Sequence, residues 1–186
     1  MADEGFKRKL TAILSADVVG YSRLMEDDET ATVRTLTSYR EVISTLTKQH
    51  NGKVVDSPGD NLLAEFASVV DAVQCAVSVQ TEITARNEDL PEQRKMQFRI
   101  GINLGDVIQE GERIYGDGVN LASRVQALGV PGSILISERV IHDIHNHPEF
   151  QPVPLGSFQL KNVAQPVQVY ALADQGLTVP AASGAR

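Results

Sequence analysis

The stretch that most constrains the fold is residues 10–22, LTAILSADVVGYS, in which an apolar run ends in an acid and then a glycine. Such a run is typical of a buried strand. A carboxylate at the end of that strand, Asp17, is costly to bury unless a cation meets it. Gly20 permits a tight turn whose N–H groups can face an anion. The stretch therefore suits a metal and a phosphate, although a strand ending in Asp is more often an ordinary cap or turn.

A second acid follows in a hairpin pattern. Residues 53–66, KVVDSPGDNLLAEF, indicate a strand, a tight turn at residues 57–60 and a second strand. If the hairpin flanks the first strand, Asp60 and Asp17 share one edge of the sheet. Two carboxylates there would suit Mg²⁺ or Mn²⁺ held mainly through substrate phosphates.

Composition narrows the class of function. The 186 residues, 42% of them hydrophobic, suffice for one domain with a substantial core. The formal net charge of −7 argues against a general nucleic-acid binder, which needs a basic surface. No apolar run reaches membrane-spanning length, residues 1–9 lack a signal-peptide core, and the single Cys75 cannot form an intrachain disulfide. We therefore expect a cytoplasmic protein without a membrane segment.

The hydrophobic periodicity predicts a mixture of helices and strands. An acidic run at residues 26–29 should open a helix over residues 30–50, because acids favour a helix N-terminus. A strand at residues 97–104 is expected to turn at Gly105 and Asp106. The other expected elements are a helix at residues 69–87, a strand at 107–109, a helix from 118 to about 128, a strand at 134–136, a helix at 137–144, and strands at 151–160 and 167–173.

The early order is strand, helix, strand, strand, helix, strand. This order predicts an α+β fold with a ferredoxin-like βαββαβ core, an antiparallel sheet with helices on one face, and added C-terminal strands and helices. We place the domain at residues 10–173, between an N-terminal tail at residues 1–9 and a disordered tail at residues 174–186.

The helix beginning near residue 118 places Asn120 and Arg124 four positions apart, on one face. An amide beside a guanidinium can grip a sugar and a phosphate during transfer, because arginine matches phosphate oxygens in a fork and keeps its charge. An isolated pair of this kind is more often a solvated helix face. We interpret Arg99, in FRIGIN, as a sheet-face residue rather than a ligand.

Together these pieces resemble the catalytic domain of class III nucleotidyl cyclases, the adenylate and guanylate cyclases. The resemblance covers residues 9–173, nearly the whole chain. Each motif is loose by itself, but their order and spacing are specific. The matching stretches are ILSADVVGYSRL, VVDSPGDNLLAEF, FRIGINLGDV, YGDGVNLASR and LKNVAQPVQVY.

The resemblance implies a role for each matching position. Asp17 and Asp60 match the two metal-binding aspartates, and Val18 matches a residue whose carbonyl helps bind a metal, so two Mg²⁺ or Mn²⁺ ions per site are implied. Asn120 matches the residue that orients the ribose, and Arg124 the residue that meets the α-phosphate. The residues matching contacts to the triphosphate are Val19, Gly20, Tyr21 and Ser22, in a turn over it, and Lys161, near its terminal phosphates.

The resemblance also implies an assembly and a reaction. The family works as a head-to-tail dimer, with the aspartates from one subunit and the Asn–Arg pair from the other, so a homodimer would hold two sites. The implied reaction converts ATP to 3′,5′-cyclic AMP and pyrophosphate for intracellular signalling. The ribose 3′-oxygen attacks the α-phosphorus, and pyrophosphate leaves.

Two positions depart from the family pattern and leave the base open. Adenylate cyclases usually carry Lys two residues before the Ile-Gly-Asp of the hairpin turn, where this chain has Asp56. Seven residues before the catalytic Asn they usually carry Asp or Thr, where this chain has Arg113. The exchanged charges could bind a purine with the polarity reversed, or could pair with each other and fill the pocket. In the first case Arg113 can donate to guanine O6 or N7, and Asp56 can accept from guanine N1–H and N2–H₂ or from adenine N6. We expect ATP as substrate; the alternatives are a guanylate cyclase using GTP, or a catalytically weak, nucleotide-binding regulatory module.

Overall fold

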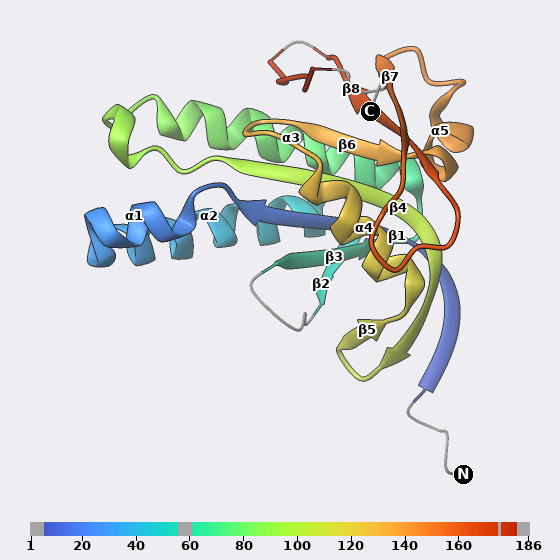
Figure 1. The fold of residues 1–186 in the computed structure, drawn as a ribbon. Coiled ribbons are helices and arrows are strands. Elements are labelled where there is room, and N and C mark those ends of the chain that lie inside the picture. Colours follow the sequence, from blue (N-terminus) through green and yellow to red (C-terminus); the bar gives the residue numbers. More distant parts are fainter. Residues whose placement is uncertain (1–5, 56–60, 175, 182–186) are drawn as a thin grey trace.

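The computed structural model describes residues 6–55, 61–174 and 176–181. Figure 1 shows the chain and labels its elements. In order these are β1 (Phe6–Val18), α1 (Tyr21–Asp27), α2 (Glu29–Gln49), β2 (Gly52–Val55), β3 (Leu62–Phe66), α3 (Val69–Asn87), a short 3-10 helix (Glu92–Arg94), β4 (Phe98–Glu110), β5 (Arg113–Tyr115), α4 (Asp117–Ala127), β6 (Ile134–Ser137), α5 (Glu138–Ile144), β7 (Pro152–Phe158) and β8 (Val167–Leu172).

One sheet forms the centre, with the strand order β2-β3-β1-β4-β6-β8-β7, and β5 pairs with β4. The part β2-β3-β1-β4, together with α2 and α3, is the expected ferredoxin-like core, which is confirmed. The hairpin strand β3 lies directly beside β1, as expected, and β2 lies outside it. The added C-terminal strands extend the other side, where β6 joins β4 in parallel and the remaining pairs are antiparallel.

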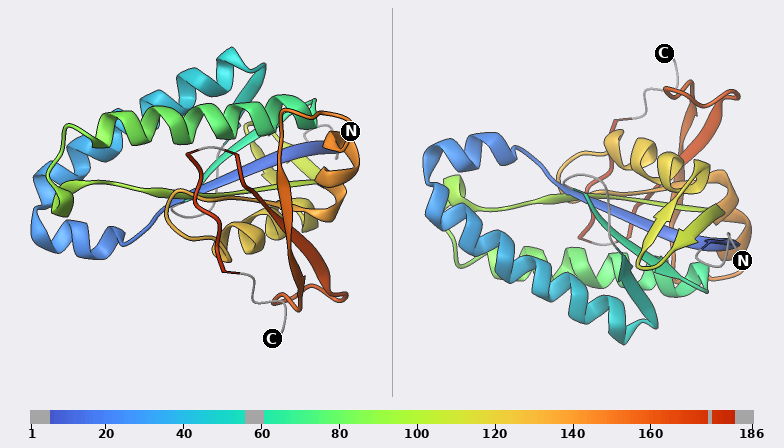
Figure 2. Two further views of the ribbon diagram at one scale, coloured as in Figure 1. Left: turned by 90° about the horizontal axis from the view of Figure 1, so that it is seen from above. Right: turned by 90° about the horizontal axis from the view of Figure 1, so that it is seen from below.

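Strand β1 is buried on both faces, which explains its nearly continuous apolar sequence. Ala12 and Leu14 face one core cluster, and Ile13 between them faces another. Helices α2 and α3 cover the first face and α4 covers the second, as Figure 2 shows. The expectation of helices on one face therefore holds for the ferredoxin-like core but not for α4.

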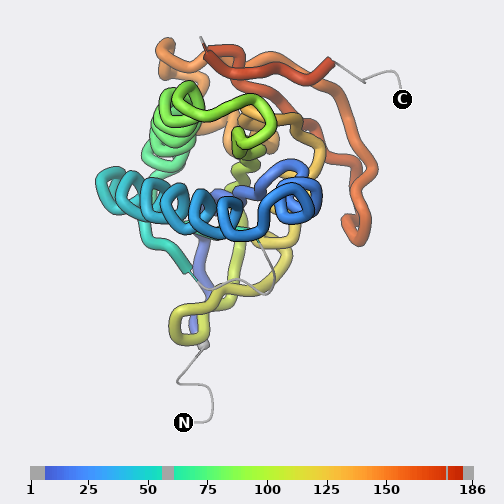
Figure 3. The backbone as a smooth tube through the Cα atoms, turned by 90° about the vertical axis from the view of Figure 1, so that its left-hand side faces the viewer, coloured from blue at the N-terminus to red at the C-terminus, as the bar shows by residue number. Residues whose placement is uncertain are grey.

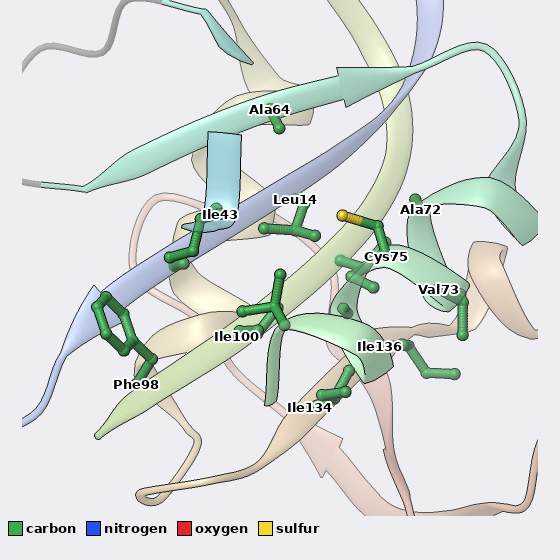
Figure 4. Close-up of a cluster of buried hydrophobic side chains, with 14 of the residues drawn as sticks. Leu14, Ile43, Ala64, Ala72, Val73, Cys75, Phe98, Ile100, Ile134 and Ile136 are labelled. Atoms are coloured by element: carbon green, nitrogen blue, oxygen red, sulfur yellow. The ribbon is translucent and has the colours of Figure 1, made fainter. Parts of the chain in front are cut away.

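The main core lies between the sheet and helices α2 and α3. Figure 4 shows Ile43 of α2 and Cys75 of α3 close to Leu14, Ile100 and Ile134 of the strands. All five side chains are fully or almost fully buried. Each large aliphatic side chain buried in this way contributes roughly 1.5–3 kcal/mol, which makes this layer the main source of stability.

The predicted turn at Gly105 and Asp106 is wrong, because β4 continues without a break to Glu110. The glycines of this strand serve the approach of α4 instead. A Cβ atom on Gly101 would lie 2.4 Å from the backbone nitrogen of Gln126, and one on Gly105 would lie 3.0 Å from Cα of Gly118. The absence of side chains lets α4 rest directly on β4.

Two further boundaries differ from the sequence expectation. Strand β1 begins at Phe6 and pairs with β4 as far as Glu110, so it takes up four residues of the expected tail. This end of the β1–β4 ladder and the β5 hairpin project together, at the bottom of Figure 3. The acidic run does not open one helix, because Asp27 ends α1 and Asp28 caps α2 by accepting from the N–H of Ala31 at 3.0 Å.

Near the C-terminus, the described chain stays attached to the domain beyond residue 173. Leu177 packs against the main core, and the N–H of Thr178 donates to the carbonyl of Gly132. None of the helices in the described ranges is long and apolar enough to cross a membrane.

Candidate active site

Asp17 is the last residue but one of β1 and lies on the sheet face that α4 covers, with about a quarter (26%) of its side chain exposed. Arg99 lies directly opposite it on β4, and its Nη2 is 3.3 Å from the Asp17 Oδ2. The cation expected beside this carboxylate is therefore Arg99, whose interpretation as only a sheet-face residue was incomplete. The signal lay in the register of β1 against β4, which the sequence does not reveal.

The turn after Asp17 has the predicted form. Gly20 is left-handed, with φ 69° and ψ 32°, and begins α1. The N–H of Val19 donates to the carbonyl of Gln97 at 2.9 Å, and the N–H of Leu24 donates to that of Gly20 at 3.1 Å. Beside this turn is a small pocket of about 100 Å³, lined by Asp17, Val18, Tyr21, Leu36 and Arg40.

The donor set around Asp17 fits a magnesium or manganese ion in part. Asp60 and Asp56 lie outside the described residues, and within them no group of three or more His, Cys, Asp or Glu side chains could hold a metal. Mg²⁺ is usually held by one or two carboxylates plus substrate phosphates, so it needs no such group. The distance from Asp17 to Arg99 exceeds the 2.7–2.9 Å of a tight charge-assisted bond. The Asp17 carboxylate can therefore still bind a cation.

Asn120 and Arg124 share one face of α4, as predicted. The opposite face, which includes Val119, Ala122 and Val125, is buried against the sheet. Asn120 is exposed and Arg124 is half-buried. The pair therefore projects from α4 away from the sheet, not toward Asp17 of the same chain.

A cluster of polar side chains, which the sequence did not suggest, joins β1 to α4. Ser15 donates to Oε1 of Gln126 at 3.1 Å, and Asn61 donates to the same oxygen at 3.0 Å. Asn61 also donates to the hydroxyls of Ser15, at 3.1 Å, and Ser123, at 3.4 Å. Arg99 adds a bond from Nη1 to the carbonyl of Ala127, the last residue of α4. These contacts fix α4 at the edge of the sheet where Asp17 lies.

The remaining predicted residues lie farther away. Arg113 is exposed on β5, and Lys161 is exposed in the loop between β7 and β8. Within one chain β4 and β6 separate β8 from β1, so Lys161 and Asp17 belong to different parts of the sheet. The structure thus brings Asp17 and Arg99 together and places Lys161 on another part of the surface.

Comparison with known proteins gives a consistent result. The family model described as the adenylate and guanylate cyclase catalytic domain matches residues 7–174. A Rhizobium meliloti (strain 1021) protein that its name classes as an adenylate cyclase is 43% identical over 171 residues, 91% of this chain. The chain spans only 29% of the length of that relative.

Solved structures share the fold. A protein from Silicibacter pomeroyi, titled an adenylate/guanylate cyclase/hydrolase, is 38% identical with a TM-score of 0.84, over 90% of this chain and 98% of that one. The adenylyl cyclase CyaB of P. aeruginosa is 23% identical with a TM-score of 0.81, over 91% of this chain and 96% of that one. The second similarity concerns the fold alone.

Proposed function

The chain belongs to the adenylate and guanylate cyclase catalytic domain family, and on that premise we propose that it converts ATP to 3′,5′-cyclic AMP and pyrophosphate as a head-to-tail homodimer. The observation that carries the proposal is the opposite placement of the two half-sites. Asp17 lies near the end of β1 on the sheet face that α4 covers, whereas Asn120 and Arg124 project from α4 away from the sheet. This arrangement supports a site that takes its aspartates from one subunit and its Asn–Arg pair from the other.

Asp17 and Asp60, with the carbonyl of Val18, would hold the two Mg²⁺ or Mn²⁺ ions. When bound, the ions lower the pKa of the attacking ribose hydroxyl and stabilise charge on the phosphates. Arg99 supplies a permanent positive charge at the same edge. Its guanidinium is held in place by bonds from Nη2 to Asp17 and from Nη1 to the carbonyl of Ala127.

The chain's other residues position the nucleotide and stabilise charge. Asn120 orients the ribose, and Arg124, which cannot lose its proton, meets the negative charge that grows on the α-phosphate. Removing such a contact costs roughly 10²–10³ in rate. The turn from Val19 to Ser22 covers the triphosphate, and Lys161 reaches its far end. Positioning accounts for most of the catalysis, as is usual in phosphoryl transfer.

Asp56 and Arg113 would form the base pocket. We propose ATP because the relative with 43% identity is classed by its name as an adenylate cyclase. An arginine such as Arg113 could also donate to guanine O6 or N7. The substrate assay therefore compares the two nucleotides directly. We further propose a role in signalling inside the cytoplasm, where ATP is available.

The experiment measures cyclic product from the purified protein with ATP or GTP, in Mn²⁺ and then in Mg²⁺. Cyclic AMP should form, and Asp60→Asn should abolish it in a protein that still folds. Cyclic GMP instead would reassign the base. No product from either nucleotide, at concentrations where a dimer is measured, would refute catalysis and favour a regulatory module.

The dimer is tested by mixing two inactive variants, Asp17→Asn and Arg124→Ala. A mixed dimer keeps one intact site, made of Asp17 from one chain and Arg124 from the other. Random mixing should restore about a quarter of the wild-type rate, since half of the dimers are mixed and each has one of two sites. A mixture as inactive as its parts would exclude the head-to-tail arrangement.

A further inference from the structure

The polar cluster of Ser15, Asn61, Ser123 and Gln126 is buried at Ser15 and Gln126 and lies in the interface between α4 and the sheet, beside a patch of apolar side chains. Its neighbours on this face of the sheet include Ile13 and Leu63, packed against Ala122 of α4. Ser15 is fully buried and Gln126 is 2% exposed. Burying polar groups here is unfavourable unless all are bonded, and apolar side chains would attach α4 equally well. Attachment alone therefore does not explain the cluster.

Hydrogen bonds are directional, so they restrict how α4 can lie on the sheet. Gly101 and Gly105 let α4 come close to β4 but do not fix its position along its own axis. Single bonds hold the two ends of α4, from Asn103 to the carbonyl of Gly118 and from Arg99 to that of Ala127. The Gln126 carbonyl oxygen adds a stronger restraint, because it accepts from two donors on separate segments, Ser15 of β1 and Asn61 before β3. Two bonds of normal length, converging on one atom, restrict sliding and rotation of the helix.

Each member of the cluster is also close in sequence to a proposed site residue. Ser15 lies two positions before Asp17, on the same face of β1. Asn61 directly follows Asp60 in the sequence, and Ser123 directly precedes Arg124. The cluster thus joins the segments that carry the aspartates to the helix that carries the Asn–Arg pair.

We propose that Gln126 is a positioning residue: by accepting hydrogen bonds from Ser15 and Asn61, it holds α4 in the register that presents Asn120 and Arg124 to the substrate. This inference rests on the proposed cyclase function. Without Gln126, Asn61 still donates to Ser15, so the aspartate segments remain joined to each other. Helix α4 loses the two shorter bonds of the cluster. It keeps the 3.4 Å contacts of Ser123 and the bonds at its ends, from Arg99 to Ala127 and from Asn103 to Gly118.

The test replaces Gln126 by Met, which is similar in size but cannot accept these bonds, and by Glu, which keeps the acceptor oxygens. We expect kcat of Gln126→Met to fall by about 10–10²-fold, since misplacement by about 1 Å has that effect, with the nucleotide KM changed less than kcat. Gln126→Glu should restore most of kcat. The matched control is Gln80→Met, which removes another buried glutamine with two hydrogen bonds on the other face of the sheet. It should lower the melting temperature similarly and leave kcat unchanged.

Mixed dimers locate the effect. Gln126→Met is placed either on the Asp17→Asn chain, which supplies only Arg124 to the intact site, or on the Arg124→Ala chain, which supplies only Asp17. The loss should appear in the first placement and not in the second. Equal losses of kcat in both placements, or an equal loss of kcat in Gln80→Met, would show that Gln126 has only a structural role and would overturn the proposal.

Hydrogen exchange provides a readout that does not need activity. The amides of α4 should exchange faster in Gln126→Met than in the wild type and remain unchanged in Gln80→Met. Unchanged exchange in Gln126→Met would refute the inference even if the wild type made no cyclic product. A wild type without product, but with faster exchange in Gln126→Met, would refute only the proposed function.

Discussion

Replacing Gly101 by alanine should displace α4 by a distance that can be worked out from the structure. A Cβ at this position would lie 2.4 Å from the backbone nitrogen and 2.6 Å from Cα of Gln126, and 2.8 Å from the carbonyl oxygen of Ala122. All three neighbours are backbone atoms, so no flexible side chain can move aside. Because ordinary contact begins at 3.4 Å, the helix must move by about 1 Å.

Two losses of different size should follow from Gly101→Ala. Overpacking of this kind costs about 1–3 kcal/mol, which lowers the melting temperature of a domain of this size by roughly 2–12 °C. Activity should fall by up to about 10²-fold, because the moved helix carries Asn120 and Arg124 and an error of about 1 Å in positioning has that effect. The rate of cyclic product formation is measured well below the melting temperature of the variant.

The control is Gly176→Ala. Gly176 has φ 91° and nothing within 4 Å of an added Cβ, so the substitution introduces backbone strain without touching α4. It should lower stability while leaving the rate at the wild-type value. A folded Gly101→Ala protein with the wild-type rate would refute the reasoning that the close approach of α4 to Gly101 matters for activity.

Three further predictions concern stability. Arg94→Met should lower the stability by about 1–3 kcal/mol in thermal melts, because this arginine is only 15% exposed and bonds Asp27 at the end of α1 and Thr32 of α2. Arg86→Met breaks an exposed ion pair with Glu82 and should cost less than about 1 kcal/mol. Burial raises the pKa of the Cys75 thiol from 9.0 to about 11. The neutral, buried thiol should therefore contribute its full stabilisation below pH 9, and this contribution should be lost as the pH rises toward 11. Alkylation of this thiol should require unfolding. Lys9→Met should destabilise the protein by about 1–3 kcal/mol, because it leaves the carboxylate of the buried Glu65 unpaired. Combining Lys9→Met with Glu65→Leu should recover most of that loss. A double variant no more stable than Lys9→Met would contradict this account.

Local pattern was enough to predict the ferredoxin-like core. The helix over Val69–Asn87 has the predicted bounds, because its apolar residues recur at helical spacing between a Ser68 cap and a polar loop. The turn at Gly20 was also predictable, since a left-handed residue there needs glycine. Both features depend on neighbours in sequence.

Features set by distant neighbours were not predictable. Gly105 resembles a turn residue in the sequence, but its role is to admit Gly118 of α4, and only the folded arrangement shows this. Arg99 faces Asp17 because of a register between strands far apart in the chain. The bonds of Gln126 likewise join three separate segments. The proposed site residues follow from motif and resemblance and stay a prediction, whereas the contacts around them required the structure.

The long ladder between β1 and β4 has a consequence for how the chain folds. Its paired residues, from Val18 with Phe98 to Phe6 with Glu110, are 80 to 104 positions apart in the sequence. At about 5–20 residues per second, a ribosome needs roughly 5–20 s to deliver β4 after β1. Pairings this distant form slowly, while the closer strand β3 can reach β1 first. Strand β1 is therefore synthesised well before its partner β4. It stays incompletely paired, and exposed to aggregation, until synthesis reaches residue 110.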